Sequence, residues 1–283
     1  MTPLVKGLVL MTSGIALLTA SDATSKYLVH SHPVGQVIAL RQLATLLVII
    51  PYLMLWRKWG ELRVSNWAGQ GLRGLAFVLG SIFIVWSLRE LPLATAITML
   101  FASPIFMVIL SAPMLGERVG LHRWVAVGAG FAGVLVIVRP GGDSFQWMVL
   151  LPLLAAMINA FRDVLTRKLS RSETSLSILF WSNIILMLAG ALTIPWGWVA
   201  VTPVAAFWFV AAGIFNGLAH FFIIEALRVG EASVVAPMRY TALLWAALLG
   251  FVVFGEVPSL WLWAGAAIIV GSSLYMLRGE RRR

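Results

Sequence analysis

The chain has 283 residues, of which 60% are hydrophobic and only 11% charged, so it lacks the roughly 25% of charged residues typical of a soluble domain. Its formal charge of +10 comes largely from basic residues in short segments between apolar runs, which argues against a nucleic-acid partner and for loops at a lipid bilayer. The absence of cysteine excludes disulfides and thiolate metal sites.

Ten apolar runs follow one another along the chain, and a membrane-spanning helix needs about 20 mostly apolar residues. The predicted spans are residues 4–25, 34–55, 67–88, 92–114, 121–138, 146–168, 176–198, 204–226, 231–254 and 260–277. The connections between them are too short to hold a soluble domain. The sequence therefore predicts an all-α integral membrane protein with ten transmembrane helices.

The basic residues predict how these spans are oriented. An even number of spans places both termini on one side, and the segments of that side carry most of the lysines and arginines. The opposite segments hold only Lys26, Arg89 and Arg139, with Arg41 just inside a span. Because basic loops stay in the cytoplasm, we expect a multi-pass protein of the bacterial inner membrane with both termini cytoplasmic.

The two halves of the chain resemble each other at an offset of 139 residues. Matched positions are Ser87-Leu88-Arg89 with Ala226-Leu227-Arg228, Gly74 with Gly213, Gly116-Glu117 with Gly255-Glu256, and Trp124 with Trp263. A two-residue adjustment also matches Asp22 and Lys26 with Asp163 and Arg167. We expect two repeats, residues 1–140 and 141–283.

Each repeat has five spans, and because five is odd the second repeat enters the membrane from the opposite side. Inverted repeats around a central cavity are common in secondary transporters, since two equivalent halves can exchange inward-open and outward-open shapes. A duplication that only builds a stable bundle is the structural alternative. The pattern favours transport by alternating access.

The Gly-Glu pair after the fourth span of each repeat resembles the drug/metabolite transporter superfamily, in its EamA-type ten-helix branch. The stretch Ala236-Pro237-Met238-Arg239-Tyr240-Thr241, followed by Leu244-Trp245-Ala246 and Phe254-Gly255-Glu256-Val257-Pro258, is also similar to that branch. The resemblance covers nearly the whole chain. It implies an inner ring of spans 1, 3, 4, 6, 8 and 9 around the path, and export of amino acids, aromatic ones favoured, and related metabolites.

Arg239 is the first candidate for substrate binding. It lies eight residues into the ninth predicted span, about 12 Å deep at 1.5 Å per residue. An arginine at that depth is costly unless it faces a cavity or a partner. Its planar guanidinium can bind a substrate carboxylate, whereas pairing with Glu225 or snorkelling to the surface is the structural alternative.

Other polar residues are candidates because their groups need partners within a bilayer. Asn216 and His220 stand four residues apart on one face of the eighth span, and Asn159 lies deep in the sixth. Each can contact substrate, and His220 can carry a proton, or each can brace neighbouring helices. Proton coupling and facilitated diffusion both stay open.

Aromatic and small side chains complete the predicted walls of the cavity. Trp86, Trp181 and Tyr240 can contact an aromatic or cationic substrate, although core packing or lipid contact is the commoner role. Thr95 and Met99 share a face of the fourth span that the repeat sets opposite the face of Tyr240. We expect these residues to line one cavity.

Two acid–base pairs at i, i+4 spacing are candidates for gates. Asp22 with Lys26 lies near the outer surface, and Asp163 with Arg167 near the inner one. We expect them to close the path alternately, with Arg41 in the outer gate. Simple charge pairs at helix ends are the structural alternative.

Motifs that would indicate an enzyme are missing from the sequence. It contains no Walker motif, no H-E-x-x-H and no nucleophile elbow. We expect no catalytic residues, metal or cofactor, and a small-molecule substrate as partner. The alternatives are uptake of another metabolite, such as a vitamin or nucleotide-like compound, and a membrane-embedded lipid-modifying enzyme.

Overall fold

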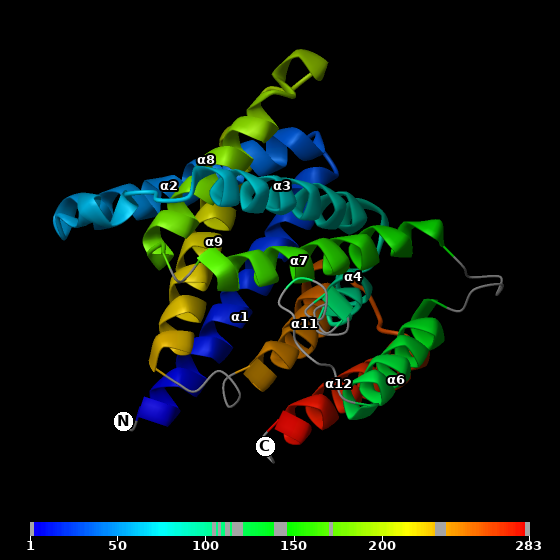
Figure 1. Ribbon diagram of the computed structural model, residues 1–283. Helices are drawn as coiled ribbons and strands as arrows, with labels where there is room; N and C mark the ends of the chain where they lie inside the picture. The colour runs from blue at the N-terminus through cyan, green and yellow to red at the C-terminus, as the bar shows by residue number, and fades with distance from the viewer. Residues whose placement is uncertain are drawn as a thin grey trace.

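The computed structural model describes residues 3–103, 106, 109–110, 114, 121–138, 146–169, 172–229 and 236–280. Every regular element in these ranges is helical, and Figure 1 shows their arrangement. The described α-helices are α1 (Pro3–Val29), α2 (Val34–Leu55), α3 (Trp67–Glu90), α4 (Leu93–Leu100), α6 (Leu121–Val138), α7 (Leu150–Leu169), α8 (Ser175–Ala191), α9 (Pro203–Val229), α11 (Thr241–Phe254) and α12 (Leu260–Glu280). One of them falls in each predicted span, which confirms the all-α fold.

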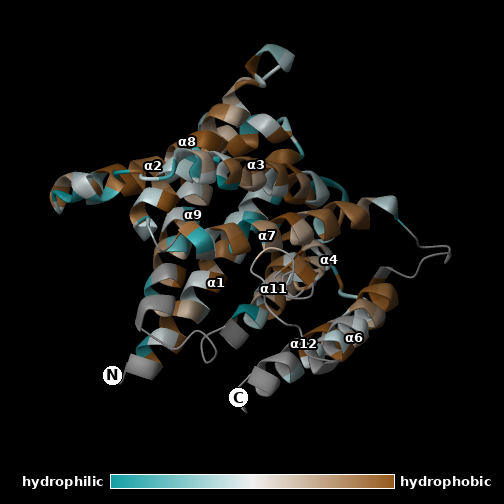
Figure 2. Cartoon of the chain, in the orientation of Figure 1, coloured by the Kyte–Doolittle hydropathy of each residue, from teal (hydrophilic) through white to brown (hydrophobic). Residues whose placement is uncertain are grey.

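Side chains are distributed as they are in a protein whose solvent is lipid. Large apolar side chains cover the outside, and Leu55 and Leu260 are 79% and 80% exposed. Polar Gln42, Thr45 and Asn183 are fully buried between helices. Figure 2 shows hydrophobic ribbon along most of the helices. Five helices are long and apolar enough to cross a membrane by themselves, and four shorter apolar helices accompany them among the described residues.

Local sequence signals decide where several helices begin and end. The side chain of Asn66 accepts a hydrogen bond from the Gly69 N–H at 2.8 Å at the start of α3. Thr174 caps α8 in the same way through the Ser177 N–H, at 3.0 Å. α11 ends at Phe254, before Gly255, whose φ of +67° suits glycine, and this agrees with the predicted end of the ninth span at residue 254.

Two predicted spans differ from the observed helices for reasons that prolines and glycines supply. The span predicted at 176–198 stops at Ala191 and continues as a 3₁₀ turn, η3 (Ile194–Trp196), before Gly197 at φ +89°. In the span predicted at 231–254, the described part opens with the 3₁₀ turn η4 (Ala236–Tyr240). Pro237 lacks the N–H that a continuous α-helix needs there. Most of the predicted 92–114 span beyond Leu100 lies outside the described residues.

Contacts between helices from both halves of the chain hold the bundle together around a central space. α1 lies along α9, α2 packs on α9 and α8, and α3 packs on α7 and α8. α6 and α12 lie side by side in Figure 1, and α12 also contacts α4. The backbones of α6 and α12 approach closely, because a Cβ added at Gly265 would lie 2.6 Å from the Gly133 carbonyl oxygen. Both ends of the chain lie on the lower side of Figure 1, which we call the terminus side.

Candidate functional site

A cavity of about 370 Å³ lies between helices of both halves of the chain. Its walls come from α1, α3, α4, α7, α8, α9, η4 and α11. The polar residues that line it are Thr19, Asp22, Arg73, Ser103, Asn159, Arg162, Asp163, Thr166, Ser175, Ser182, His220 and Arg239. Charged and hydrogen-bonding groups thus converge inside a bundle whose exterior is apolar, as they do in a binding site for a small polar molecule.

The cavity lies in the half of the bundle nearer the terminus side. His220 and Ile223 are in the second half of α9, which ends on that side in Figure 1, and Ala242 is in the first turn of α11, which starts there. On α1, the lining residue furthest from the N-terminus is Asp22, in the last third of the helix.

Arg73 is held against the wall by two hydroxyl groups. Its Nε donates to Thr166 Oγ1 at 2.7 Å, and its Nη1 donates to Ser182 Oγ. These bonds join α3 to α7 and α8. The guanidinium is therefore fixed at the cavity surface by neighbours that carry no charge.

Arg162 and Asp163 are consecutive residues of α7 on the same cavity. Arg162 Nη2 lies 3.2 Å from Asp163 Oδ1, and its guanidinium stacks over the Phe77 ring at 5.3 Å. Both side chains are partly exposed to the cavity. Asp163 was predicted to pair with Arg167, whose side chain lies outside the described part of the chain.

A buried ion pair closes the bundle on the side opposite the termini. Lys26 Nζ lies 2.9 Å from Glu256 Oε1, with side chains 6% and 19% exposed. Lys26 also donates to the carbonyl oxygens of Leu88, at 3.2 Å, and Leu91, where α3 ends. Glu256 Oε2 accepts the N–H of Leu93, which starts α4, at 2.8 Å. We call this group of contacts the Lys26–Glu256 clasp.

The predicted pairing of Asp22 with Lys26 is wrong. Asp22 Oδ1 instead lies 3.6 Å from Arg41 Nη1, and Arg41 also donates to Ser25 Oγ at 3.0 Å. Lys26 turns toward Glu256 and the carbonyl end of α3, where the helix dipole also favours a cation. Lys26 contacts groups on other helices and not Asp22 one turn away, because Glu256 supplies a full negative charge and the end of α3 supplies carbonyl oxygens.

Several residues predicted to bind substrate do meet at the cavity. Arg239, His220 and Asn159 line it. Tyr240 packs edge-on against Phe101, a lining residue, at 5.3 Å between ring centroids. Arg239 is in the 3₁₀ turn η4 and exposed, whereas the sequence predicts a membrane-spanning helix at this residue.

Other predicted residues lie elsewhere. Met99 has no exposed surface in the apolar core, and Thr95 is on the same short helix but not among the lining residues. Trp181 donates its indole N–H to the Leu62 carbonyl at 2.9 Å, outside the cavity. Asn216 is buried and donates to Thr45 Oγ1 at 3.2 Å. Their contact with substrate stays a prediction that this arrangement does not support.

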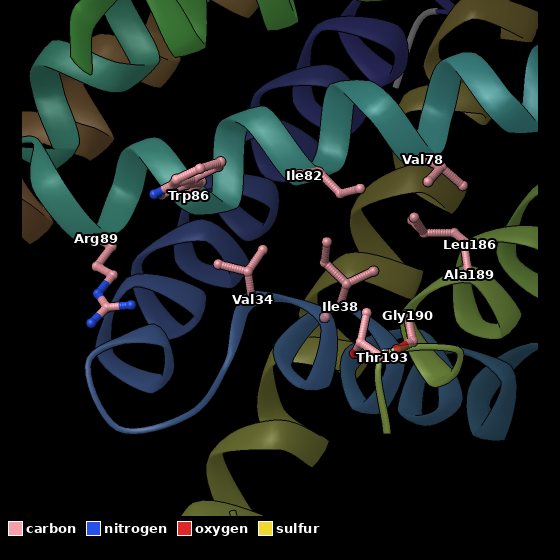
Figure 3. A pocket seen from close by; sticks show the side chains of 11 residues that line it. Val34, Ile38, Val78, Ile82, Trp86, Arg89, Leu186, Ala189, Gly190 and Thr193 are labelled. Atoms are coloured by element: carbon pink, nitrogen blue, oxygen red, sulfur yellow. Dashed lines mark hydrogen bonds between the residues drawn. The ribbon is translucent and has the colours of Figure 1, made fainter. Parts of the chain in front are cut away.

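Trp86 lies in a separate pocket between α2, α3 and α8. Figure 3 shows its indole beside Arg89 at one end of the pocket, with aliphatic side chains such as Ile38 and Leu186 along the walls. No lining residue of this pocket is shared with the central cavity. The structure thus separates Trp86 from Arg239 and His220.

Sequence reasoning missed Arg73, Arg162 and the partner of Lys26. Arg73 and Arg162 belong to none of the basic loops, and this signal alone could have marked them as membrane-embedded cations. Glu256 was interpreted only as part of the Gly-Glu pair that follows the fourth span of each repeat. Its side chain folds back, and its contact with Lys26 joins residues 230 positions apart in the chain.

Comparison with known proteins finds one family and several relatives that this chain resembles along most of its length. The model of the EamA-like transporter family matches residues 5–139 and again 146–278. A "Riboflavin transporter" of Vibrio cholerae serotype O1 is 31% identical over 99% of this chain and 95% of its own length. An "S-adenosylmethionine uptake transporter" of Rickettsia prowazekii is 29% identical over 95% and 92%. One solved structure, described only as a crystal structure of a protein, is 22% identical, covers 98% of both chains and has a TM-score of 0.67, which shows the shared fold.

Proposed function

The chain belongs to the EamA-like transporter family, and we propose that its central cavity carries a small metabolite bearing an aromatic ring and an ionic group. That it is a multi-pass membrane transporter follows from the family. The observation that supports the substrate class is the lining. Three arginines, two aspartates and His220 face one space, together with the rings of Phe77 and Phe101. Opposite charges suit a zwitterion, and ring faces suit a planar group.

Two candidate substrates fit this lining. A vitamin or nucleoside-like compound is favoured by the relatives named for riboflavin and S-adenosylmethionine, the latter an uptake carrier. An aromatic amino acid, moved outward, is favoured by the presence of both arginines and aspartates (Asp22 and Asp163) in the lining, which complement a carboxylate and an ammonium group. We propose that Arg239, His220, Asn159 and Tyr240 contact whichever molecule is carried.

Alternating access is the mechanism we propose, with residues 1–140 and 141–283 as the two halves that move. In the arrangement described, the Lys26–Glu256 clasp and the Asp22–Arg41 pair close the side opposite the termini. The cavity reaches toward the terminus side. We propose that Asp163 and Arg167 take part in closing that side in the other state. The repeat relation of Asp22 and Lys26 to these two residues supports this exchange.

A flux assay tests the proposed function directly. Purified protein in proteoliposomes is given labelled riboflavin, S-adenosylmethionine, phenylalanine and tryptophan, with and without a pH gradient. We expect saturable uptake of one class, competed by unlabelled compound, and a response to the gradient only if protons are coupled. Turnover of a lipid without flux of any solute would instead favour a membrane-embedded enzyme.

The proposed orientation, with both termini in the cytoplasm of a bacterial cell, can be tested in a chain that has no cysteine of its own. Gly60→Cys lies between α2 and α3, where an added side chain meets nothing within 4 Å, and Val201→Cys lies exposed between α8 and α9. In spheroplasts, we expect an impermeant maleimide to label Val201→Cys. Gly60→Cys should react only after the membrane is permeabilised, and the reverse pattern would refute the orientation.

A further inference from the structure

Arg73 is a cavity cation whose hydrogen-bond partners, within the described residues, are neutral. Thr166 Oγ1 and Ser182 Oγ accept from its Nε and Nη1. A guanidinium has five N–H donors, so these two bonds leave three. An arginine kept in an apolar bundle without a carboxylate partner needs an explanation, because an embedded charge is costly.

The two hydroxyl groups are oriented so that they can only accept from Arg73. Thr166 Oγ1 donates its single proton to the carbonyl oxygen of Arg162 at 2.7 Å. Ser182 Oγ donates its proton to the carbonyl oxygen of Ile178 at 2.6 Å. Each hydroxyl therefore presents a lone pair to Arg73. They fix the direction of the guanidinium and do not neutralise it.

The carboxylates that line the cavity already have cationic partners. Asp163 lies 3.2 Å from Arg162, and Asp22 lies 3.6 Å from Arg41. Arg73 is within electrostatic range of both Arg162 and Asp163, whose charges oppose each other. His220 is within range of Arg41, Arg73, Arg162 and Arg239. The region around Arg73 therefore carries an excess of positive charge.

A purely structural role does not account for the charge of Arg73. Its bonds brace α3 against α7 and α8, but a neutral donor such as glutamine could brace them without a charge in the membrane. We propose that Arg73, with Arg162 beside it, is an anion subsite that holds a carboxylate or phosphate group of the transported molecule. This rests on the proposed transport function and adds the chemical group that the cavity selects.

Arg73 suits this role better than Arg239. Arg239 is exposed in the 3₁₀ turn η4, whereas Arg73 is held in one direction by two side chains. A guanidinium that is already ordered loses less conformational entropy when it binds. The Phe77 ring, 5.3 Å from the guanidinium of Arg162, places an aromatic surface next to the subsite for a ring attached to the anionic group.

Ligand pairs that differ in one anionic group test the subsite in purified protein. Riboflavin 5′-phosphate against riboflavin probes phosphate, and phenylalanine against phenylethylamine probes carboxylate. The readouts are thermal stabilisation for binding and flux in proteoliposomes for transport. We expect wild type to bind the anionic member of at least one pair more tightly. Arg73→Gln should weaken that member by about tenfold, the equivalent of about 1.4 kcal/mol, and leave the uncharged or carboxylate-free member unchanged.

Controls separate the subsite from a brace and from the transport function itself. Arg89→Gln removes a 53% exposed arginine outside the cavity and should leave both members of each pair unchanged. Arg73→Lys keeps the charge and should retain part of the preference. Equal weakening of both members with a lower melting temperature of the unliganded protein would mean a brace, and no binding of any anionic member would also overturn the subsite. Binding of anions without flux would uphold the subsite and overturn transport.

Discussion

Glu256→Gln should abolish most transport and open the cavity toward the side opposite the termini. The variant leaves Lys26 buried without its anionic partner, 2.9 Å away in the native clasp, and weakens the contact that Glu256 makes with Leu93. Removal of one member of a buried ion pair costs about 3–5 kcal/mol. The clasp joins α1, the end of α3, the start of α4 and the end of α11. Its loss therefore destabilises the conformation that is closed on the side opposite the termini, relative to the conformation that is open there.

Access to the cavity provides the measurement. Thr19 lines the cavity, and Thr19→Cys would introduce the single thiol of the chain. In the native background, reagent applied from the side opposite the termini should react slowly with that thiol. In the Glu256→Gln background the reaction should be at least tenfold faster, since each 1.4 kcal/mol shifts the population tenfold.

The matched control is Glu61→Gln. Glu61 forms an ion pair with Lys58 at 3.1 Å, but both side chains are more than a third exposed. Exposed pairs contribute at most about 1 kcal/mol, so transport should be nearly unchanged. Replacing both clasp residues, as Lys26→Met with Glu256→Leu, should restore folding better than either single change, because no charge stays unpaired. A Glu256→Gln protein with native flux and native labelling would contradict the gate.

Gly213→Ala should destabilise the bundle more than the same change at its repeat counterpart Gly74. A Cβ at this position of α9 would lie 2.3 Å from the Ala44 Cβ and 2.7 Å from the Arg41 carbonyl oxygen. Both are atoms of α2 that cannot rotate away. Inserting a methyl group into packed surroundings typically costs about 1–3 kcal/mol, and we expect the upper end here.

The repeat supplies a graded comparison for this prediction. Gly74 is the counterpart of Gly213, but its added Cβ would meet chiefly the end of the Ile185 side chain, at 2.4 Å from Cδ1, which can move. Gly71, on the same helix α3, meets nothing within 4 Å. We expect melting temperatures in detergent to fall most for Gly213→Ala, less for Gly74→Ala, and to stay level or rise for Gly71→Ala, where a helix gains about 1 kcal/mol from alanine.

Separation of α2 from α9 would also disturb the Asp22–Arg41 pair, which lies on the side opposite the termini. Thr45 Oγ1 on α2 lies 3.1 Å from both the Arg41 and the Gly213 carbonyl oxygens, so it ties the two helices at the predicted clash. Arg41 in turn holds Asp22. A Gly213→Ala protein that melts as late as Gly71→Ala would show that the two helices can separate without cost.

The sequence by itself determined the approximate position of each described helix and the pairing of these helices into two repeats. Spans can be predicted because lipid imposes a minimum apolar length on each segment separately, so the signal is local. Gly255 could be assigned as a helix end for a similar reason, since a positive φ is a property of one residue. Candidates such as Arg239 and His220 were found because a polar group in an apolar run stands out by itself.

Only the tertiary structure decided which charges meet. Spacing predicted an Asp22–Lys26 pair, yet their partners are Arg41 and Glu256, on other helices. Met99 and Trp86 stood in plausible positions along the chain, but helix rotation placed one in the core and the other in a separate pocket. Arg73 was not predicted as a site residue, because its position at the cavity depends on hydrogen bonds to Thr166 and Ser182, about a hundred residues further along the chain. Partners on different helices are selected by how the helices rotate and pack, which no local pattern specifies.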